Sequence, residues 1–93
     1  MTVEIILKGR VQGVGCRYYC GQVARAMKLS GSATNQYDGS VRILLHVENI
    51  DMAEKFCSNL RRNTFGYNFW GSFTSIEIRG SVNEEINGDY LWK

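Results

Sequence analysis

Hydrophobic and polar residues alternate along the first positions of the chain. Val3, Ile5 and Leu7 occur in a period of two with polar or charged neighbours, which is typical of a half-buried strand. Two glycines within residues 10–15 end this pattern and predict a loop. We expect the helix that follows to end just before Gly31, which can adopt a left-handed cap. Apolar residues at a helical spacing of three or four positions form its predicted buried face: Cys16, Tyr19, Cys20, Val23, Ala26 and Met27.

A hairpin and a second helix are predicted in the middle of the chain. Residues 32–37 and 40–47 flank Asp38-Gly39, a pair that favours a tight turn between two antiparallel strands. Asn49 or Asp51 can cap the helix that comes next. The apolar face of the later strand is Val41, Ile43, Leu45 and Val47, and the buried stripe of the helix is Ala53, Phe56, Cys57 and Leu60.

The last third of the chain predicts two more strands. Residues 72–79 form a strand centred on Ile76 and Ile78, and a turn at Asn87-Gly88 precedes a short strand over 89–92. The element order is therefore β-α-β-β-α-β with a short C-terminal strand. It predicts an α/β (α+β) sandwich of the ferredoxin-like class, with two helices on one face of a mainly antiparallel sheet. With 93 residues, we expect a single domain over 1–93.

The inventory of reactive side chains excludes several kinds of chemistry. The chain has one histidine, His46, three cysteines and a net charge of +2. This charge is too small for an electrostatic nucleic-acid binder. Cys16 and Cys20, with one distant histidine, do not make a zinc site, so we interpret the cysteines as small buried hydrophobic residues. We expect no metal and no cofactor.

The first residues and the cysteine count bear on location. Residues 1–8 contain an acid at Glu4 and an apolar run of only three residues, unlike a secretory signal or a transit peptide. An odd number of cysteines favours a reducing compartment. No stretch approaches the roughly 20 apolar residues that span a bilayer. We therefore expect a cytoplasmic monomer with no membrane and no nucleic-acid partner.

The loop between the first strand and the first helix carries the candidate chemistry. Gly13 and Gly15 let the backbone approach a ligand closely and turn several N–H groups inward, and the helix N-terminus adds unsatisfied donors. Arg17 lies in the first helical turn, where its guanidinium can bind two phosphate oxygens. The loop lacks the Gly-Lys-Ser/Thr ending of a P-loop, and Tyr18 occupies the third glycine position of a dinucleotide fingerprint. These parts suit a phosphoryl group.

Two linked motifs resemble one known family. Gly9-Arg-Val-Gln-Gly-Val-Gly-Cys-Arg17 resembles the signature loop of the acylphosphatases, which usually reads Gly-x-Val-Gln-Gly-Val-x-Phe-Arg. The family's second motif, Gly-x-Val-x-Asn-x-x-Asp-Gly-x-Val, is matched by Gly31-Ser-Ala-Thr-Asn35-Gln-Tyr-Asp38-Gly39-Ser-Val41. Chain length, motif spacing and element order also resemble that family. The resemblance covers the whole chain and is strongest over residues 5–47.

The resemblance implies an activity and a site. The family hydrolyses acyl phosphates, which are carboxyl–phosphate anhydrides, to a carboxylate and inorganic phosphate, without a metal or a covalent intermediate. It implies that Arg17 and Asn35 are catalytic, with Asn35 holding the attacking water. Carboxylate is a good leaving group, so positioning and charge stabilisation suffice and a substrate oxygen can take the proton. The implied phosphate-binding residues are Gln12, Gly13, Val14, Gly15, Cys16 and Arg17.

The sequence departs from the family pattern in three places. Cys16 replaces the usual phenylalanine, and its thiol is either packed and inert or sensitive to oxidation. Ser32-Ala33 replaces a typical Trp-Val, which removes bulk from the second strand. Residues 65–73 are rich in aromatic residues. They either pack against the second helix, form an apolar wall for the acyl group or present a surface to a partner.

Two other functions remain open at this stage. The first is an anion-binding module that keeps the phosphate loop but has little or no catalytic role. The second is RNA binding, because RNA-recognition domains share the order of elements. Those domains stack bases on aromatic residues of the third strand, whereas residues 40–47 here contain no phenylalanine, tyrosine or tryptophan. The sequence therefore disfavours RNA binding.

Overall fold

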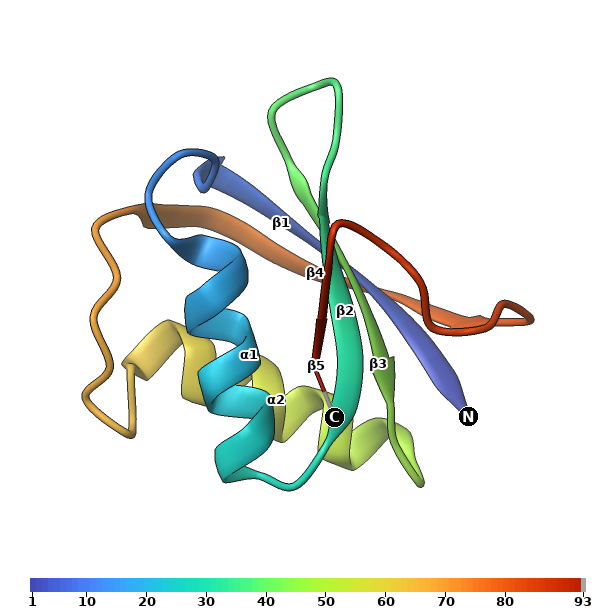
Figure 1. Cartoon of the computed structure of the whole chain (residues 1–93). Coiled ribbons are helices and arrows are strands. Elements are labelled where there is room, and N and C mark those ends of the chain that lie inside the picture. Colours follow the sequence, from blue (N-terminus) through green and yellow to red (C-terminus); the bar gives the residue numbers. More distant parts are fainter. Residues whose placement is uncertain (93) are drawn as a thin grey trace.

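A five-stranded antiparallel sheet forms one layer of the molecule, and two helices form the other (Figure 1). The computed structural model describes residues 1–92. The elements are β1 (Thr2–Arg10), α1 (Cys16–Ala26), β2 (Ser30–Asn35), β3 (Val41–His46), α2 (Ile50–Arg62), β4 (Ser72–Val82) and β5 (Tyr90–Trp92). The strand order is β4-β1-β3-β2-β5. The predicted ferredoxin-like sandwich is confirmed, with strand ends shifted from the predicted ones by a few residues.

The sheet register brings the ends of β1 and β2 together. Leu7 of β1 and Asn35 of β2 are both paired with Val41 of β3, from opposite sides. The C-terminal ends of β1 and β2 therefore lie at the same end of the sheet. The loop over residues 11–15, which follows β1, emerges there, so the register alone places Asn35 near this loop.

The core lies between the sheet and the helices. The fully buried Tyr19 of α1 donates its hydroxyl to the carbonyl oxygen of Leu60 in α2, at 2.7 Å, and so ties the two helices together. Of the two predicted caps, Asn49 is the one that caps α2, because its side-chain oxygen accepts the N–H of Met52 at 3.0 Å. Strand residues beneath the helices complete the core: Val3, Ile5, Leu7, Val41, Ile43 and Leu45. Within residues 1–92, no helix has the length and apolar character needed to cross a membrane.

Two predictions about the end of α1 are wrong. The helix ends at Ala26, and the left-handed residue after it is Lys28, with φ of 61°, not Gly31. Gly31 lies inside β2, where a Cβ atom would come within 2.5 Å of the carbonyl oxygen of Leu44. Ala26 is exposed, and Ala24 is buried in its place. Gly31 is thus required by close packing within the sheet, which a local pattern cannot reveal.

Candidate active site

Two glycines hold the loop between β1 and α1 in a left-handed conformation. Gly13 has φ of 73° and Gly15 has φ of 79°, values that residues with a side chain rarely adopt. Gly15 is also the N-cap of α1, and it leaves the helix without a side-chain cap. The first turn of α1 contains no acidic residue. The unsatisfied N–H groups and the positive end of the helix therefore favour an anion at this loop.

Hydrogen bonds brace the loop from both sides. The side-chain amide of Gln12 donates to the carbonyl oxygens of Gln36 and Ser40, at 2.6 and 2.9 Å, and ties the loop to the β2–β3 hairpin. On the other side, the N–H of Trp70 donates to the carbonyl oxygen of Val14 at 3.4 Å. The side-chain nitrogen of Gln12 is occupied by these bonds, and neither Gln12 nor Val14 is among the residues that line the cavity at this loop. A loop held in this way needs little rearrangement when an anion binds.

Arg17 and Asn35, the two predicted catalytic residues, meet at one carboxylate. Oδ2 of Asp89 accepts the backbone N–H of Asn35 at 3.0 Å and lies 3.6 Å from Nη1 of Arg17. Both residues therefore lie within 4 Å of a single oxygen atom. The side-chain oxygen of Asn35 is buried and has no hydrogen-bond partner among the described residues. A buried amide oxygen without a partner is uncommon in folded proteins.

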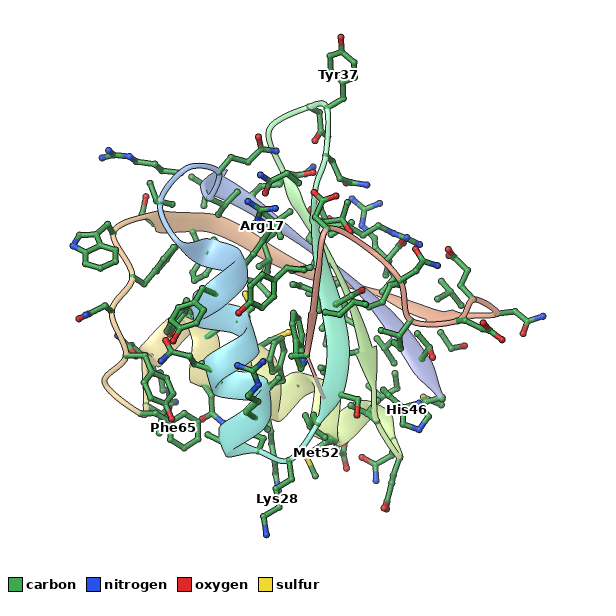
Figure 2. The ribbon with its side chains drawn as sticks, viewed as in Figure 1. Arg17, Lys28, Tyr37, His46, Met52 and Phe65 are labelled. Atoms are coloured by element: carbon green, nitrogen blue, oxygen red, sulfur yellow. The ribbon has the colours of Figure 1, made fainter. Side chains whose placement is uncertain are left out.

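A cavity of about 210 Å³ lies between the loop, the first turn of α1 and Tyr90 of β5. Arg17 lies at the loop end of α1, whereas His46 lies at the far end of the sheet (Figure 2). The register agrees, because β3 pairs with β2 from Val41 opposite Asn35 to His46 opposite Ser30. The chain's one histidine is therefore remote from the cavity. The residues that line it are Val11, Gly13, Gly15, Cys16, Arg17, Tyr18 and Tyr90.

Asp89 is the site residue that sequence reasoning missed. It immediately precedes β5, which pairs with β2 through Ala33 opposite Tyr90, and its N–H donates to the side chain of Thr34 at 3.2 Å. An acid after Asn87-Gly88 is visible in the sequence. The sequence does not show which strand β5 joins, so the position of Asp89 beside Asn35 could not be predicted.

The three cysteines are buried, free thiols. Sγ of Cys16 lies 3.9 Å from Sγ of Cys20 on the next turn of α1. Burial raises the pKa of the Cys20 thiol well above its usual range and raises the pKa of Cys57 to about 11. Cys16 is 2% exposed, and this burial favours the packed interpretation of its thiol. Over residues 1–92, no cluster of three or more histidine, cysteine or acidic side chains could hold a metal ion.

The aromatic segment over residues 65–73 divides into two parts. Phe69 is partly buried and stacks on Tyr19 and on Phe73, with ring centroids 4.9 Å apart in both pairs. Phe69 is therefore partly buried as predicted, but its ring packs on α1 and β4, whereas the prediction placed it against the second helix. Trp70 is 70% exposed and Phe65 is 40% exposed, so these two rings have faces that no core residue covers.

Comparisons with known proteins identify the class to which this fold and loop belong. The family model described as Acylphosphatase matches residues 3–68. The chain is 28% identical to the protein in the crystal structure of acylphosphatase from Bacillus subtilis, with a TM-score of 0.72, covering 98% of this chain and 93% of that one. The chain belongs to the acylphosphatase family, as its two motifs predicted.

Two relatives bear the same name. An acylphosphatase of Lactococcus lactis subsp. lactis is 41% identical over 59 residues, which are 63% of this chain and 61% of the relative. An acylphosphatase of Borrelia garinii subsp. bavariensis is 29% identical over 87 residues, which are 81% of this chain and 94% of the relative. The match thus spans about three fifths of the first relative and nearly all of the second. Together with the family match, they support the predicted hydrolysis of acyl phosphates.

Proposed function

We propose that this chain is an acylphosphatase, which hydrolyses acyl phosphates to a carboxylate and inorganic phosphate. One observation carries the proposal. The braced left-handed loop at the start of α1 adjoins Arg17 and Asn35, which both lie within 4 Å of one carboxylate oxygen. The guanidinium of Arg17 and the backbone N–H of Asn35 thus contact the same carboxylate, Asp89, next to a set of backbone donors.

The loop and Arg17 supply the binding step. Backbone N–H groups from Gln12 to Arg17 surround the phosphoryl oxygens, and the helix N-terminus favours their negative charge. The guanidinium of Arg17 adds a charge-assisted pair of hydrogen bonds. These groups also bind the transition state, in which charge is spread over the same oxygens.

Asn35 supplies the positioning of the nucleophile. Its side-chain amide offers one acceptor and two donors that can hold a water molecule, and it does not titrate. The water oxygen attacks phosphorus, and the bond between phosphorus and the acyl oxygen breaks with its electron pair leaving on the carboxylate. The water proton passes to a phosphoryl or carboxylate oxygen of the substrate. This route uses no side-chain base, which agrees with the remote position of His46.

Asp89 is a positioning residue in this scheme. Its carboxylate is held by the N–H of Asn35 and faces the guanidinium of Arg17, so it orients both. It is partly exposed, with 46% of its side chain accessible, so the ion pair itself adds little to folding. Its negative charge also repels a phosphate dianion, so it lowers the affinity for phosphate while it orients Asn35 and Arg17.

Selective hydrolysis tests the reaction class. We expect turnover of acetyl phosphate and none of phenyl phosphate, a stable monoester, with no effect of EDTA. Arg17→Ala should lose inorganic phosphate binding and turnover together. Bound phosphate with acetyl phosphate turnover no faster than in buffer would establish the anion-binding module instead. Strong inhibition by EDTA would contradict the metal-free scheme.

The remaining expectations belong to this proposal. The partner is a small-molecule acyl phosphate, the chain acts as a monomer in the cytoplasm, and nucleic acid is not a ligand. The odd number of cysteines, all buried as free thiols, supports a reducing compartment. Light scattering of the purified protein checks the oligomeric state.

A further inference from the structure

The β4–β5 connection, residues 83–89, crosses the sheet on the face opposite the helices. β4 and β5 are the two edge strands, so the chain has to pass β1, β3 and β2 between them (Figure 1). The connection contacts Ser32 of β2 and Arg42 of β3. Both alternate along their strands with core residues that face the helices, such as Ala33 and Ile43.

Three contacts bind the end of the β4–β5 connection to β2. The hydroxyl of Ser32 donates to the carbonyl oxygen of Asn87 at 2.6 Å. The N–H of Asp89 donates to the hydroxyl of Thr34 at 3.2 Å. Gly88 lies so close to β2 that a Cβ atom there would be 2.1 Å from the hydroxyl oxygen of Thr34. The connection therefore lies directly on the sheet up to the residue that reaches the active site.

Arg42 holds the start of the same connection. Its Nη2 donates to the carboxylate of Glu84 at 2.5 Å, and its Nε donates to Glu4 of β1, also at 2.5 Å. Hydrogen bonds between two charged groups are among the stronger ones in proteins. Arg42 is also paired in the sheet with Thr34, the residue that accepts the N–H of Asp89. Arg42 is thus fixed on the sheet by Glu4 and holds the connection through Glu84.

The pairing of β5 is too short to place Asp89 by itself. Residues 90–92 pair with residues 31–33 of β2, and Asp89 precedes the first of these pairs. Its carboxylate is nevertheless placed closely, since it accepts the N–H of Asn35 at 3.0 Å and lies 3.6 Å from Arg17. The position of this carboxylate therefore depends on the β4–β5 connection as well as on β5.

We propose that Arg42 is a positioning residue of the active site. Its ion pair with Glu84 holds the β4–β5 connection on the sheet. The connection in turn fixes the carboxylate of Asp89 against Asn35 and beside Arg17. Arg42 does not line the cavity beside Arg17, so it acts only through these residues. The inference rests on the proposed function, because that function assigns Arg17 and Asn35 to the reaction.

Hydrogen exchange of one amide reports the position of Asp89 without any substrate. The N–H of Asn35 donates to the carboxylate of Asp89, so this amide exchanges faster when the carboxylate moves away. Asp89→Ala gives the rate without the acceptor. Glu84→Lys replaces the attraction to Arg42 by repulsion. By NMR, we expect the Asn35 amide to exchange about fivefold faster in Glu84→Lys, because a partly exposed ion pair shifts an equilibrium by up to roughly this factor.

Glu85→Lys is the matched control. Glu85 is the next residue, it is exposed, and its carboxylate is in no ion pair within residues 1–92. Both variants change the net charge equally, so their long-range effects on an anion are alike. We expect the Asn35 amide in Glu85→Lys to exchange within about twofold of the wild type. Equal exchange in Glu84→Lys and Glu85→Lys would overturn the inference.

A variant of Arg42 tests the arginine directly. Arg42→Met removes the charge, and we expect the Asn35 amide to exchange about fivefold faster, as in Glu84→Lys. Arg79→Met is its control, because it breaks a comparable exposed ion pair, 3.5 Å from Glu77 within β4. An equal rise in Asn35 exchange in Arg79→Met would show a general loss of stability and would contradict the inference.

Turnover shows whether the position of Asp89 matters for the reaction. We expect kcat for acetyl phosphate to fall about three- to fivefold in Glu84→Lys and to stay unchanged in Glu85→Lys. In an Asp89→Ala background, Glu84→Lys should lower kcat no further, because the carboxylate that Arg42 positions is absent. Multiplicative losses in the double variant, or faster Asn35 exchange with unchanged kcat, would refute the positioning role.

The two kinds of measurement separate this inference from the proposed function. Faster Asn35 exchange in Glu84→Lys, in a protein that hydrolyses no acyl phosphate, would refute the proposed activity and support the contact through Arg42. Hydrolysis of acetyl phosphate by the wild type, with Glu84→Lys and Glu85→Lys alike in exchange and kcat, would support the activity and refute the inference.

Discussion

Replacement of Asn35 by alanine separates the binding of phosphate from its transfer. The backbone of Asn35 carries its structural contacts, because it pairs with Val41 and donates its N–H to Asp89. An alanine keeps both. The variant therefore removes only a side-chain amide whose oxygen is buried without a protein partner.

The size of the effect follows from this geometry. Loss of one group that orients a reacting atom typically lowers kcat about 10²- to 10³-fold, or roughly 2.7–4 kcal/mol. The phosphoryl charge is met by Arg17 and the loop, so the inhibition constant of inorganic phosphate should change less than about threefold. Removing a buried polar group that lacks a partner costs little stability. We therefore expect a melting temperature within about 3 °C of the wild type.

The assay is acetyl phosphate hydrolysis, with inorganic phosphate as a competitive inhibitor. Asn83→Ala is a suitable control, because Asn83 is exposed and follows Val82, which pairs with Thr2 at the opposite end of the sheet. Turnover by Asn35→Ala within fivefold of the wild type would refute the assigned role. A parallel loss of phosphate affinity would show that Asn35 acts in binding and not in positioning water.

Three further changes probe the site and the core. Asp89→Asn keeps the acceptor but removes the charge, so phosphate should inhibit at about fivefold lower concentration, the effect of roughly 1 kcal/mol of repulsion. Asp89→Ala should lower kcat. Equal inhibition constants in wild type and Asp89→Asn would contradict this. Tyr19→Phe leaves the carbonyl of Leu60 without its 2.7 Å donor. Calorimetry should show that the free energy of unfolding falls by about 1–2 kcal/mol and the melting temperature by roughly 5–15 °C. A fall in melting temperature of under 2 °C would be inconsistent with that bond. Burial raises the pKa of Cys20, and raises that of Cys57 to about 11. The thiols should therefore resist iodoacetamide at pH 8 until the protein unfolds. Because the folded pKa values exceed the unfolded ones, denaturation midpoints should fall as pH rises from about 9 towards 11.

Features with local causes could be predicted from the sequence. The alternation of Val3, Ile5 and Leu7 predicted β1, and the two candidate caps, Asn49 and Asp51, predicted the start of α2, because each signal depends on residues a few positions apart. Gly31 shows where local reasoning fails. Its position after a helical pattern indicated a cap, but the carbonyl of Leu44 on the neighbouring strand requires a residue without a side chain.

The candidate site divides in the same way. The loop with Gly13, Gly15 and Arg17 is contiguous, so the sequence alone predicted a phosphoryl site there and indicated the family through its motifs. Asn35 was predicted from the second motif. It lies near that loop because Asn35 and Leu7, near the end of β1, both pair with Val41. By itself the sequence thus determined the order of elements, and it predicted the kind of ligand.

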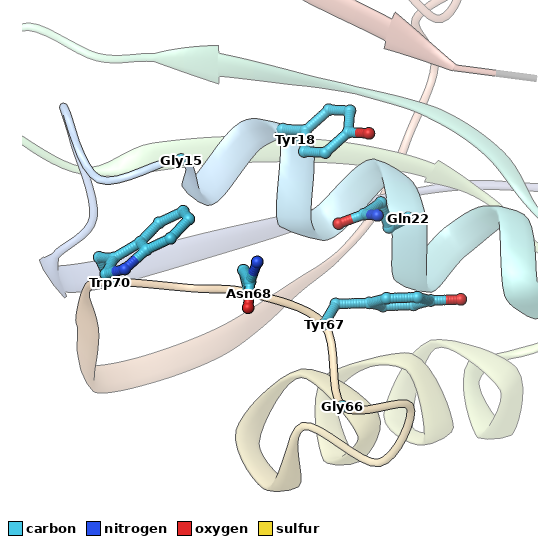
Figure 3. A pocket seen from close by; sticks show the side chains of 7 residues that line it. All are labelled: Gly15, Tyr18, Gln22, Gly66, Tyr67, Asn68 and Trp70. Carbon is cyan, nitrogen blue, oxygen red and sulfur yellow. The ribbon is translucent and has the colours of Figure 1, made fainter.

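Only the tertiary structure decided what surrounds that ligand. Asp89 comes to Asn35 across 54 positions of the chain, because β5 adds to the edge of β2. Trp70 comes to Gly15 because the connection after α2 runs alongside α1 (Figure 3). Both contacts depend on how separate elements pack, and no pattern along the chain encodes that packing directly. The chemistry of the loop could therefore be predicted from its residues, whereas the contacts of Asp89 with Asn35 and of Trp70 with Gly15 depend on the fold.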